Sequence, residues 1–261
     1  MSEGCPPVVL HIPHASAIIP DEIRATLVLS GPELEDELRV MTDWYTEELF
    51  AVDASLARTI VFPMSRLVVD PERFVDDELE EMAKVGMGVV YTRTSLGESL
   101  RQGLTAEDKA ALIEKYYEPH HRRLASAVAE ALAAHGRCLI VDGHSFPTLA
   151  LPYELDQRPN RPDVCIGTDD FHTPPQLLDL AVQAVKEEEL RVEVNRPFSG
   201  TLVPLEHYGK NPDVQSIMIE IRRGLYMDEV TGEKLSEFEG VREGIGRALK
   251  TIADHLRRAT S

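Results

Sequence analysis

Short apolar runs alternate with longer amphipathic stretches along the whole chain. The runs are rich in Val, Ile and Leu, as buried strands are. They cover residues 8–13, 57–63, 137–143, 163–168, 191–195 and 216–221. Strands that alternate with helices in this way form a largely parallel sheet that helices cover on its faces. The pattern therefore predicts an α/β fold with a mostly parallel or mixed central sheet flanked by helices.

Helix signals stand between several of these runs. The sequence TAED at 105–108 is typical of a capping box, and the helix that it opens is predicted to continue to about residue 136. Pro119 should kink this helix or split it in two. Two prolines precede a second predicted helix over 176–190, and a third is expected over about 233–258.

The composition is that of an ordinary globular protein, with 43% hydrophobic and 28% charged residues among 261. This length is enough to bury one sizeable core. The chain contains no repeat, no low-complexity linker and no change of composition that would divide it. We therefore expect residues 1–261 to form a single domain.

A formal net charge of −18 opposes the basic surface that phosphate groups require. Nucleic acid and anionic membranes are thus poor partners, and an anionic substrate would need a local group of arginines. The chain has no apolar run of about eighteen residues and no signal-peptide pattern at its start, which favours a cytoplasmic protein. Cys5, Cys138 and Cys165 are scattered and odd in number, so we expect core thiols rather than disulfides or a cysteine metal site.

Histidines and acidic residues stand where two of the apolar runs end. His11 lies inside the run VVLHIP and His14 just after it, while Asp142 and His144 follow CLIV, with Gly143 between them allowing close approach to a ligand. Two histidines at separate strand ends, together with one carboxylate, would make a three-ligand zinc site with a fourth position for water. The alternative is that each histidine only hydrogen-bonds a loop. No compact motif of the HExxH type decides between them.

A third run, SIMIEIRR, contains the other carboxylate of interest. Glu220 is flanked by two isoleucines, where an unpaired carboxylate is costly to bury. Alternation along a strand predicts Glu220 and Arg222 on one face and Arg223 on the other. Glu220 is therefore either a reactive group or one partner of a buried ion pair with an arginine, and the two interpretations are compatible.

Seven sequence blocks in fixed order resemble a known family. They are IPHAS at 12–16, TDWYTEELF at 42–50, SRLVVDPERF at 65–74, YYEPHHRRL at 116–124, VDGHS at 141–145, NRPFSG at 195–200 and IMIEIRRGLYMDE at 217–229. Together they resemble the N-formylglutamate amidohydrolases, which are distant relatives of the zinc carboxypeptidases and aspartoacylase. The resemblance spans nearly the whole chain. It implies a carboxypeptidase-like α/β fold, a single zinc ion and hydrolysis of an N-acyl amide.

The resemblance also implies metal ligands. His14 matches the first zinc ligand and His144 the last. The wider carboxypeptidase group supplies a glutamate three residues after the first histidine, but this chain reads HASA there. Asp43 is the best replacement, and Glu47, one helical turn later, is the alternative. Asp43 could instead be only the cap of the helix that follows.

Further site residues follow from the same blocks. Glu220 resembles the catalytic glutamate that takes a proton from water and hands it to the departing amine. Arg73, with Arg66 before it, resembles the arginine that grips the substrate carboxylate, although Glu72 replaces a neutral asparagine. The remaining expected substrate contacts are Arg222 and, in a loop that usually carries two glycines after Phe, Ser199 and Gly200.

These expectations combine into one leading hypothesis. The chain would be a zinc-dependent amidohydrolase that cleaves N-formyl-L-glutamate to formate and L-glutamate, a step of histidine degradation. One alternative is a deacylase or carboxypeptidase-like hydrolase of another acidic acyl-amino acid or peptide. Another is a catalytically silent protein that binds such a metabolite.

Overall fold

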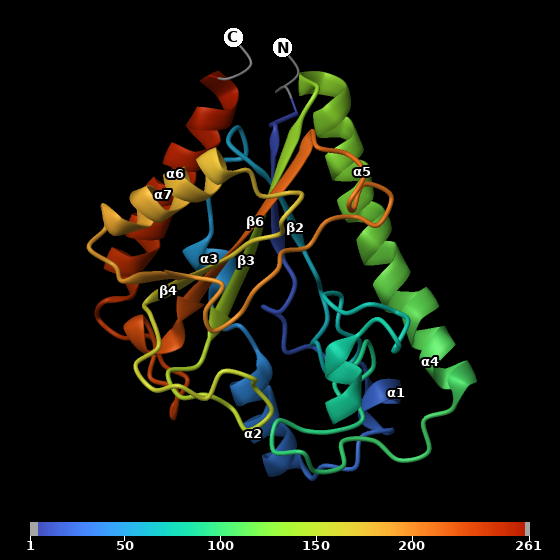
Figure 1. The fold of residues 1–261 in the computed structure, drawn as a ribbon. Helices are drawn as coiled ribbons and strands as arrows, with labels where there is room; N and C mark the ends of the chain where they lie inside the picture. Colours follow the sequence, from blue (N-terminus) through green and yellow to red (C-terminus); the bar gives the residue numbers. More distant parts are fainter. Residues whose placement is uncertain (1–4, 259–261) are drawn as a thin grey trace.

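The computed structural model describes residues 5–258 of the chain. Its centre is a six-stranded sheet with helices packed on both sides (Figure 1). Each predicted run corresponds to one strand: β1 (Val8–Ile12), β2 (Arg58–Val61), β3 (Cys138–Phe146), β4 (Val164–Gly167), β5 (Val192–Val194) and β6 (Val214–Arg222). The predicted α/β class is confirmed.

The order of the strands across the sheet is β2-β1-β3-β6-β4-β5. The first four strands in this order are parallel to one another. β4 runs antiparallel to β6, and β5 is parallel to β4. The sheet is therefore mixed, and the carboxyl ends of β1, β3 and β6 meet at one edge.

Alternation along the central strands divides their apolar side chains between two faces. Val8 and Leu10 face α6 (Pro175–Lys186) and α7 (Phe238–Arg258) in the larger core cluster. Val9 and Ile140 face α5 (Glu118–His135) in a second cluster on the opposite side. Figure 1 shows α5 on one side of the sheet and α6 and α7 on the other.

The predicted helices form, with shifted ends. The capping box at Thr105 opens α4 (Ala106–Leu112), and a π-helical turn (η2, Ile113–Tyr117) separates it from α5. The predicted kink or split is thus a widened, π-helical turn just before Pro119, and the chain stays helical through it. α6 ends at Lys186, short of the predicted residue 190, and α7 begins at Phe238, later than predicted.

The N-terminal region contains three further short helices, of which the last is the helix expected after Asp43 and the first two lay outside the sequence prediction. They are α1 (Asp21–Arg24), α2 (Gly31–Met41) and α3 (Thr46–Leu49), and a 3-10 turn, η1 (Glu81–Val85), follows later. Only α2 carries a clear sequence signal, because Ser30 and Glu33 form a capping box ahead of it. α1 is a single turn, too short for a periodic pattern to reveal, and α3 is a single turn as well.

Gly143 is needed for core packing rather than for ligand approach. It points to the face opposite its neighbours Asp142 and His144. A β-carbon at Gly143 would lie 2.7 Å from Cδ1 of Ile12 and 3.1 Å from the ring of Phe50. The expectation that this glycine lets the backbone approach a ligand is therefore wrong.

The three cysteines are free thiols, as expected, and Cys138 and Cys165 are buried. Cys5 is only partly buried, so it is not a core thiol. Of the helices within residues 5–258, none combines the length and the apolar character needed to cross a membrane.

Candidate active site

Three parallel strands present polar side chains on the same face of the sheet. His11 of β1 is in register with Asp142 of β3, and His144 of β3 is in register with Glu220 of β6. Residues in register on adjacent strands point to the same side, with strands roughly 4.7–4.9 Å apart. The alternation that buries Val8 and Leu10 on one face therefore gathers these four polar residues on the other.

His14, Asp43 and His144 come together from three separate segments of the chain. His14 lies just beyond β1, Asp43 lies between α2 and α3, and His144 is in β3. The backbone amide of Asp43 donates a hydrogen bond to the carbonyl of His14 at 2.9 Å, which fastens the two segments together. All three side chains are buried.

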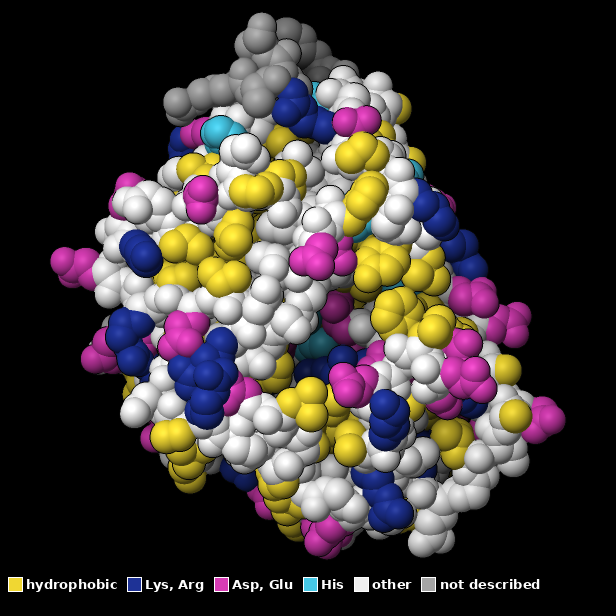
Figure 2. Space-filling model, in the orientation of Figure 1, with side chains coloured by type: hydrophobic (Ala, Val, Ile, Leu, Met, Phe, Trp, Pro, Cys, Tyr) yellow, Lys and Arg dark blue, Asp and Glu magenta, His cyan; other side chains and the backbone are white. Residues whose placement is uncertain are grey.

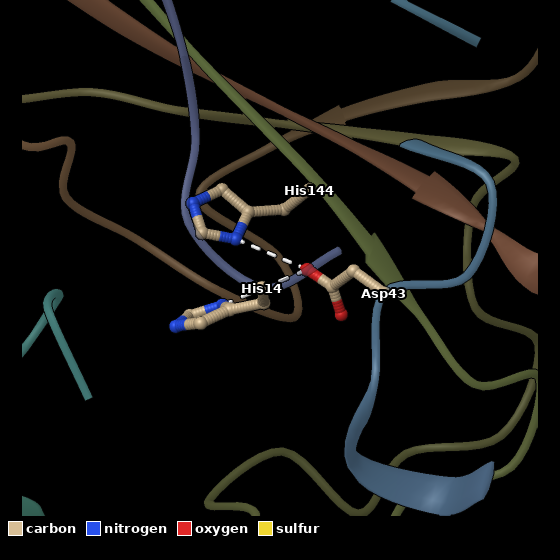
Figure 3. A group of neighbouring side chains, drawn as sticks. All are labelled: His14, Asp43 and His144. Carbon is tan, nitrogen blue, oxygen red and sulfur yellow. Dashed lines mark hydrogen bonds and ion pairs between the residues drawn. The ribbon is translucent and has the colours of Figure 1, made fainter. Parts of the chain in front are cut away.

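The spacing of these side chains suits a small divalent metal ion. Oδ2 of Asp43 lies 3.6 Å from Nδ1 of His14 and 3.2 Å from Nδ1 of His144, and both rings point toward it in Figure 3. Ligand atoms at about 2.0–2.1 Å from a tetrahedral zinc ion lie about 3.3 Å from one another. Nδ1 of His14 is buried without a hydrogen-bond partner. The three atoms thus fit a zinc ion by type, number and spacing.

The far nitrogen of each histidine faces a buried carboxylate. Nε2 of His14 lies 2.8 Å from Oδ1 of Asp70, and Nε2 of His144 lies 3.2 Å from Oδ1 of Asp142. Metal-binding histidines typically have such a partner, which fixes the ring and leaves the other nitrogen free for the ion. Burial raises the pKa of Asp70, but Arg66 and His14 outweigh it and hold this pKa well below its ordinary range.

Arg223 orients Asp43 from the other side. Its Nη2 donates to Oδ1 of Asp43 at 2.9 Å, and its Nε donates to the hydroxyl of Ser145 at 3.1 Å. The prediction that Arg223 faces away from Glu220 is wrong, because β6 ends at Arg222 and a 3-10 turn (η3, Arg223–Leu225) redirects the chain. The ion pair leaves Oδ2 of Asp43 for the two histidines.

Asp43 is not a helix cap. The N-cap position of α3 belongs to Tyr45, whose φ of 65° is left-handed, and no side-chain hydrogen bond caps this helix. Glu47, the alternative ligand, lies exposed on α3. The structure therefore brings Asp43, and not Glu47, to the two histidines.

Glu220 lies beside this group with a free carboxylate oxygen. The residue is buried, and its Oε2 has no hydrogen-bond partner. Burial, with only partial compensation from His144, raises the pKa of Glu220 to about 7. Among residues 5–258 it forms no ion pair with either Arg222 or Arg223. Arg222 pairs instead with Asp163, at 2.6 Å.

A cavity of about 480 Å³ opens over these groups. Its lining includes the metal-site residues, Glu220 and four of the five expected substrate contacts, namely Arg66, Arg73, Ser199 and Gly200. Arg222 is absent from the described lining, so its expected role as a substrate contact finds no support. Figure 2 shows the hollow near the middle of this face, with histidine and charged side chains in its depth.

The two arginines of the cavity differ in their hydrogen-bond partners within the protein. Arg66 donates to Oδ2 of Asp70 at 2.8 Å and to the hydroxyl of Tyr91 at 3.0 Å. Nε of Arg73 is buried without a hydrogen-bond partner, and it lies 3.7 Å from Oδ2 of Asp70. Arg73 therefore has a donor without a protein partner and is better placed than Arg66 to bind an anion.

Comparison with known proteins gives the family of the chain. The profile of the N-formylglutamate amidohydrolase family matches residues 6–227. The chain belongs to this family. An N-formylglutamate deformylase of Pseudomonas aeruginosa is 29% identical over 235 residues, with 87% of this chain and 84% of the relative covered. One of Pseudomonas putida is 26% identical over 234 residues, with the same coverage.

Solved structures support the fold. The crystal structure of an N-formylglutamate amidohydrolase from Ralstonia eutropha superposes with a TM-score of 0.83 at 23% identity, over 98% of this chain and 96% of that one. A gene product of Agrobacterium tumefaciens superposes with a TM-score of 0.71 at 20% identity, over 99% and 93%. At these identities the similarity is one of fold.

A second group of histidine and carboxylates lies beside His14, Asp43 and His144. Nδ1 of His11 lies 2.8 Å from Asp142 and 3.2 Å from Glu72, and its Nε2 lies 2.8 Å from Nε2 of His120. Burial opposes the charge, but the two carboxylates raise the pKa of His11 to about 9. Burial and the charge of His11 lower the pKa of His120 to about 2. A protonated His11 paired in this way explains the group without a metal ion.

This arrangement also explains Glu72. The resembled block has a neutral asparagine where this chain has Glu72, next to the expected substrate contact Arg73. The carboxylate instead serves as a counter-charge to His11, although it also lines the cavity. His11 itself was noticed in the sequence, but its partners come from distant segments that no spacing predicts.

Tyr153 is a cavity residue that the sequence analysis missed. Its hydroxyl lies 3.7 Å from the sulfur of Met41, and burial raises its pKa. It lies in the loop after β3, in which a buried ion pair between Glu154 and Arg161 joins two parts of the loop. A lone tyrosine in an irregular loop carries no signal that would single it out.

Proposed function

We propose that this protein is a zinc-dependent amidohydrolase that cleaves N-formyl-L-glutamate to formate and L-glutamate. The observation that carries the proposal is the convergence of Asp43 and two histidine Nδ1 atoms beside the unpaired carboxylate of Glu220. The substrate is suggested by the family and by the two relatives named N-formylglutamate deformylase.

Nδ1 of His14, Oδ2 of Asp43 and Nδ1 of His144 would hold the zinc ion. A zinc ion bound in a site with an open position polarises a carbonyl oxygen and makes water more acidic. Asp70 holds the ring of His14 through a hydrogen bond, Asp142 lies 3.2 Å from Nε2 of His144 as a counter-charge, and Arg223 keeps Asp43 in place. The protein thus needs no rearrangement of these side chains to bind the metal.

Glu220 moves the proton of the reaction. Its pKa of about 7 allows the carboxylate to accept a proton from the attacking water near neutral pH. The same carboxyl then returns the proton to the nitrogen of the departing amino acid. The absence of an ion-pair partner keeps Oε2 available for both transfers.

Arg73 binds a carboxylate of the substrate. Its guanidinium lines the cavity and has a buried nitrogen without a partner. A planar guanidinium suits a carboxylate better than an ammonium does, because it donates two parallel hydrogen bonds. Arg66 supports this position through the shared carboxylate of Asp70.

The test is formate release from N-formylglutamate by the purified protein. We expect turnover that is lost after treatment with a chelator and restored by added zinc. A parallel series of N-acetyl and N-succinyl amino acids should be cleaved more slowly. If one of these compounds is cleaved faster than N-formylglutamate, that compound is the better substrate. If no compound is turned over with zinc present, the result favours a catalytically silent binding protein.

A further inference from the structure

The mouth of the cavity differs in chemistry from its base. Five of its lining residues are apolar or aromatic and exposed: Phe74 (38%), Leu79 (68%), Leu155 (80%), Leu205 (59%) and Tyr208 (41%). The base holds the metal-site residues, Glu220 and the arginines, which are buried or nearly so. Figure 2 shows hydrophobic side chains around the central hollow and charged ones inside it. The cavity is thus polar in its depth and apolar at its rim.

These apolar residues are held in place rather than left on free loops. The buried carboxylate of Glu80 accepts hydrogen bonds from the backbone amides of Phe74 and Met82, which fixes the segment that carries Phe74 and Leu79. The rings of Phe74 and Tyr208 contact each other with centroids 6.5 Å apart. Two separate loops are therefore joined across part of the rim.

The third segment of the rim is fixed by a buried ion pair. Arg161 pairs with Glu154, next to Leu155, and donates to the carbonyl of Pro147 at 2.8 Å. The guanidinium also lies 5.5 Å from the ring centre of Phe198, which precedes Ser199 in the cavity wall. A preformed apolar surface binds a ligand without the entropy cost of ordering loops.

The cavity is larger than N-formylglutamate requires. That compound has about a dozen non-hydrogen atoms, whereas drug-sized ligands occupy cavities of roughly 300–1,000 Å³. The volume here is about 480 Å³. Room for an additional substituent therefore remains between the reacting amide and the rim.

Charge disfavours an anionic substituent in that space. Glu81 lines the cavity and is exposed, and the chain as a whole carries a net charge of −18. An apolar group is not repelled, and it removes the rim leucines and aromatic rings from water.

We propose, on the basis of the proposed hydrolase function, that the rim is a subsite for an apolar extension of an N-acyl amino acid. The extension is either an acyl chain longer than formyl or an apolar amino-acid side chain. In both cases the amide and one carboxylate occupy the polar base, and the extension lies against Phe74, Leu79, Leu155, Leu205 and Tyr208.

Two series of compounds test this subsite. The first lengthens the acyl group on glutamate from formyl to butanoyl and octanoyl, and the second places norleucine or phenylalanine in N-formyl amino acids. Dissociation constants are measured by calorimetry on the Glu220→Gln protein, and kcat/KM on the unchanged protein. We expect the affinity to rise in at least one of the two series. The rise should be about two- to fourfold for each methylene that the rim buries.

Leu155→Asp should reduce this gain at least fivefold, because it places a charge where the extension lies. Leu96→Asp is the matched control, since Leu96 is similarly exposed (67%) but does not line the cavity. It should leave the ratio between extended and short compounds unchanged.

Three results would overturn the subsite. One is affinity that stays flat or falls with length in both series. Another is an equal effect of Leu155→Asp on extended and short compounds. The third is a dimer, detected by light scattering, that Leu155→Asp converts to monomer without any change in selectivity. Absence of hydrolysis with every compound would contradict the proposed function alone, because the calorimetric series needs no turnover.

Discussion

At the scale of single residues, Asp70 joins the proposed metal site to the proposed substrate site. Its Oδ1 faces Nε2 of His14, and its Oδ2 accepts a hydrogen bond from Arg66 and lies 3.7 Å from Arg73. A buried carboxylate without such partners would be costly. One side chain therefore sets the orientation of a proposed zinc ligand and of both cavity arginines.

Arg73→Lys tests the carboxylate contact. We expect kcat/KM for N-formylglutamate to fall about tenfold or more, because the ammonium keeps the positive charge but cannot donate the two parallel hydrogen bonds of the guanidinium. Hydrolysis of a neutral activated formamide should change little. Steady-state kinetics on both substrates give the comparison, with the exposed Arg122→Lys as control. Equal losses on both substrates would assign Arg73 to the fold or to the metal site.

Glu220→Gln tests the proton transfer. The amide keeps the shape of the side chain but cannot accept the proton, so kcat should fall about a hundredfold or more while zinc content and melting temperature are preserved. The exposed Glu206→Gln serves as control. A kcat within a few-fold of the unchanged protein would make Glu220 a structural residue.

At the scale of helices and strands, alternation explains what the sequence could predict. The apolar runs located all six strands. The pairing of β1, β3 and β6, which the sequence did not predict, brings His11, Asp142, His144 and Glu220 to one face. The alternation of side chains between two faces holds only within a strand. Arg223 lies beyond the end of β6, so the prediction of its face was wrong. The position of Asp43 depends on the loop between α2 and α3, and on contacts between segments more than a hundred residues apart, which no local pattern contains.

Arg222→Met tests the structural role of this arginine at the end of β6. Burial raises the pKa of Asp163, but Arg191 and Arg222 lower it further, so the net pKa is below its ordinary value. The ionised carboxylate therefore stabilises the fold above its unfolded pKa, and this stabilisation is lost as the pH falls through the lowered folded pKa.

We expect the substitution to reduce stability by about 1 kcal/mol at pH 7, given partial solvent screening. The melting temperature should fall a few degrees, and the difference from the unchanged protein should shrink in acid. Thermal unfolding across pH measures both effects. An increase in KM at unchanged stability would restore Arg222 as a substrate contact.

Gly143→Ala tests the packing behind the site. The added methyl group would press on Ile12 and Phe50, and overpacking of this kind commonly costs about 1–3 kcal/mol. The matched control is Gly246→Ala in α7, where a β-carbon meets no atom within 4 Å and alanine favours the helix. Opposite signs of the two shifts in melting temperature are expected. A neutral Gly143→Ala would show that the core adjusts at no cost.

At the scale of the whole molecule, one sheet serves two purposes. One face buries the main core under α6 and α7, and the other carries the polar residues at the carboxyl ends of β1, β3 and β6. The resemblance of seven blocks predicted the family and named the proposed metal ligands, Glu220 and four of the substrate contacts that line the cavity. It did not predict the protonated His11, Tyr153 or the apolar rim, because these depend on side chains outside the shared blocks or on partners distant in the sequence.

The central claim is that His14, Asp43 and His144 hold one metal ion, and elemental analysis of zinc tests it most directly. The purified protein should contain about one zinc per chain. His14→Ala, Asp43→Ala and His144→Ala should each lose most of it, whereas Glu47→Ala, which removes the exposed alternative carboxylate, should retain it. Full zinc content in any of the first three variants, with the fold checked by circular dichroism, would contradict the site.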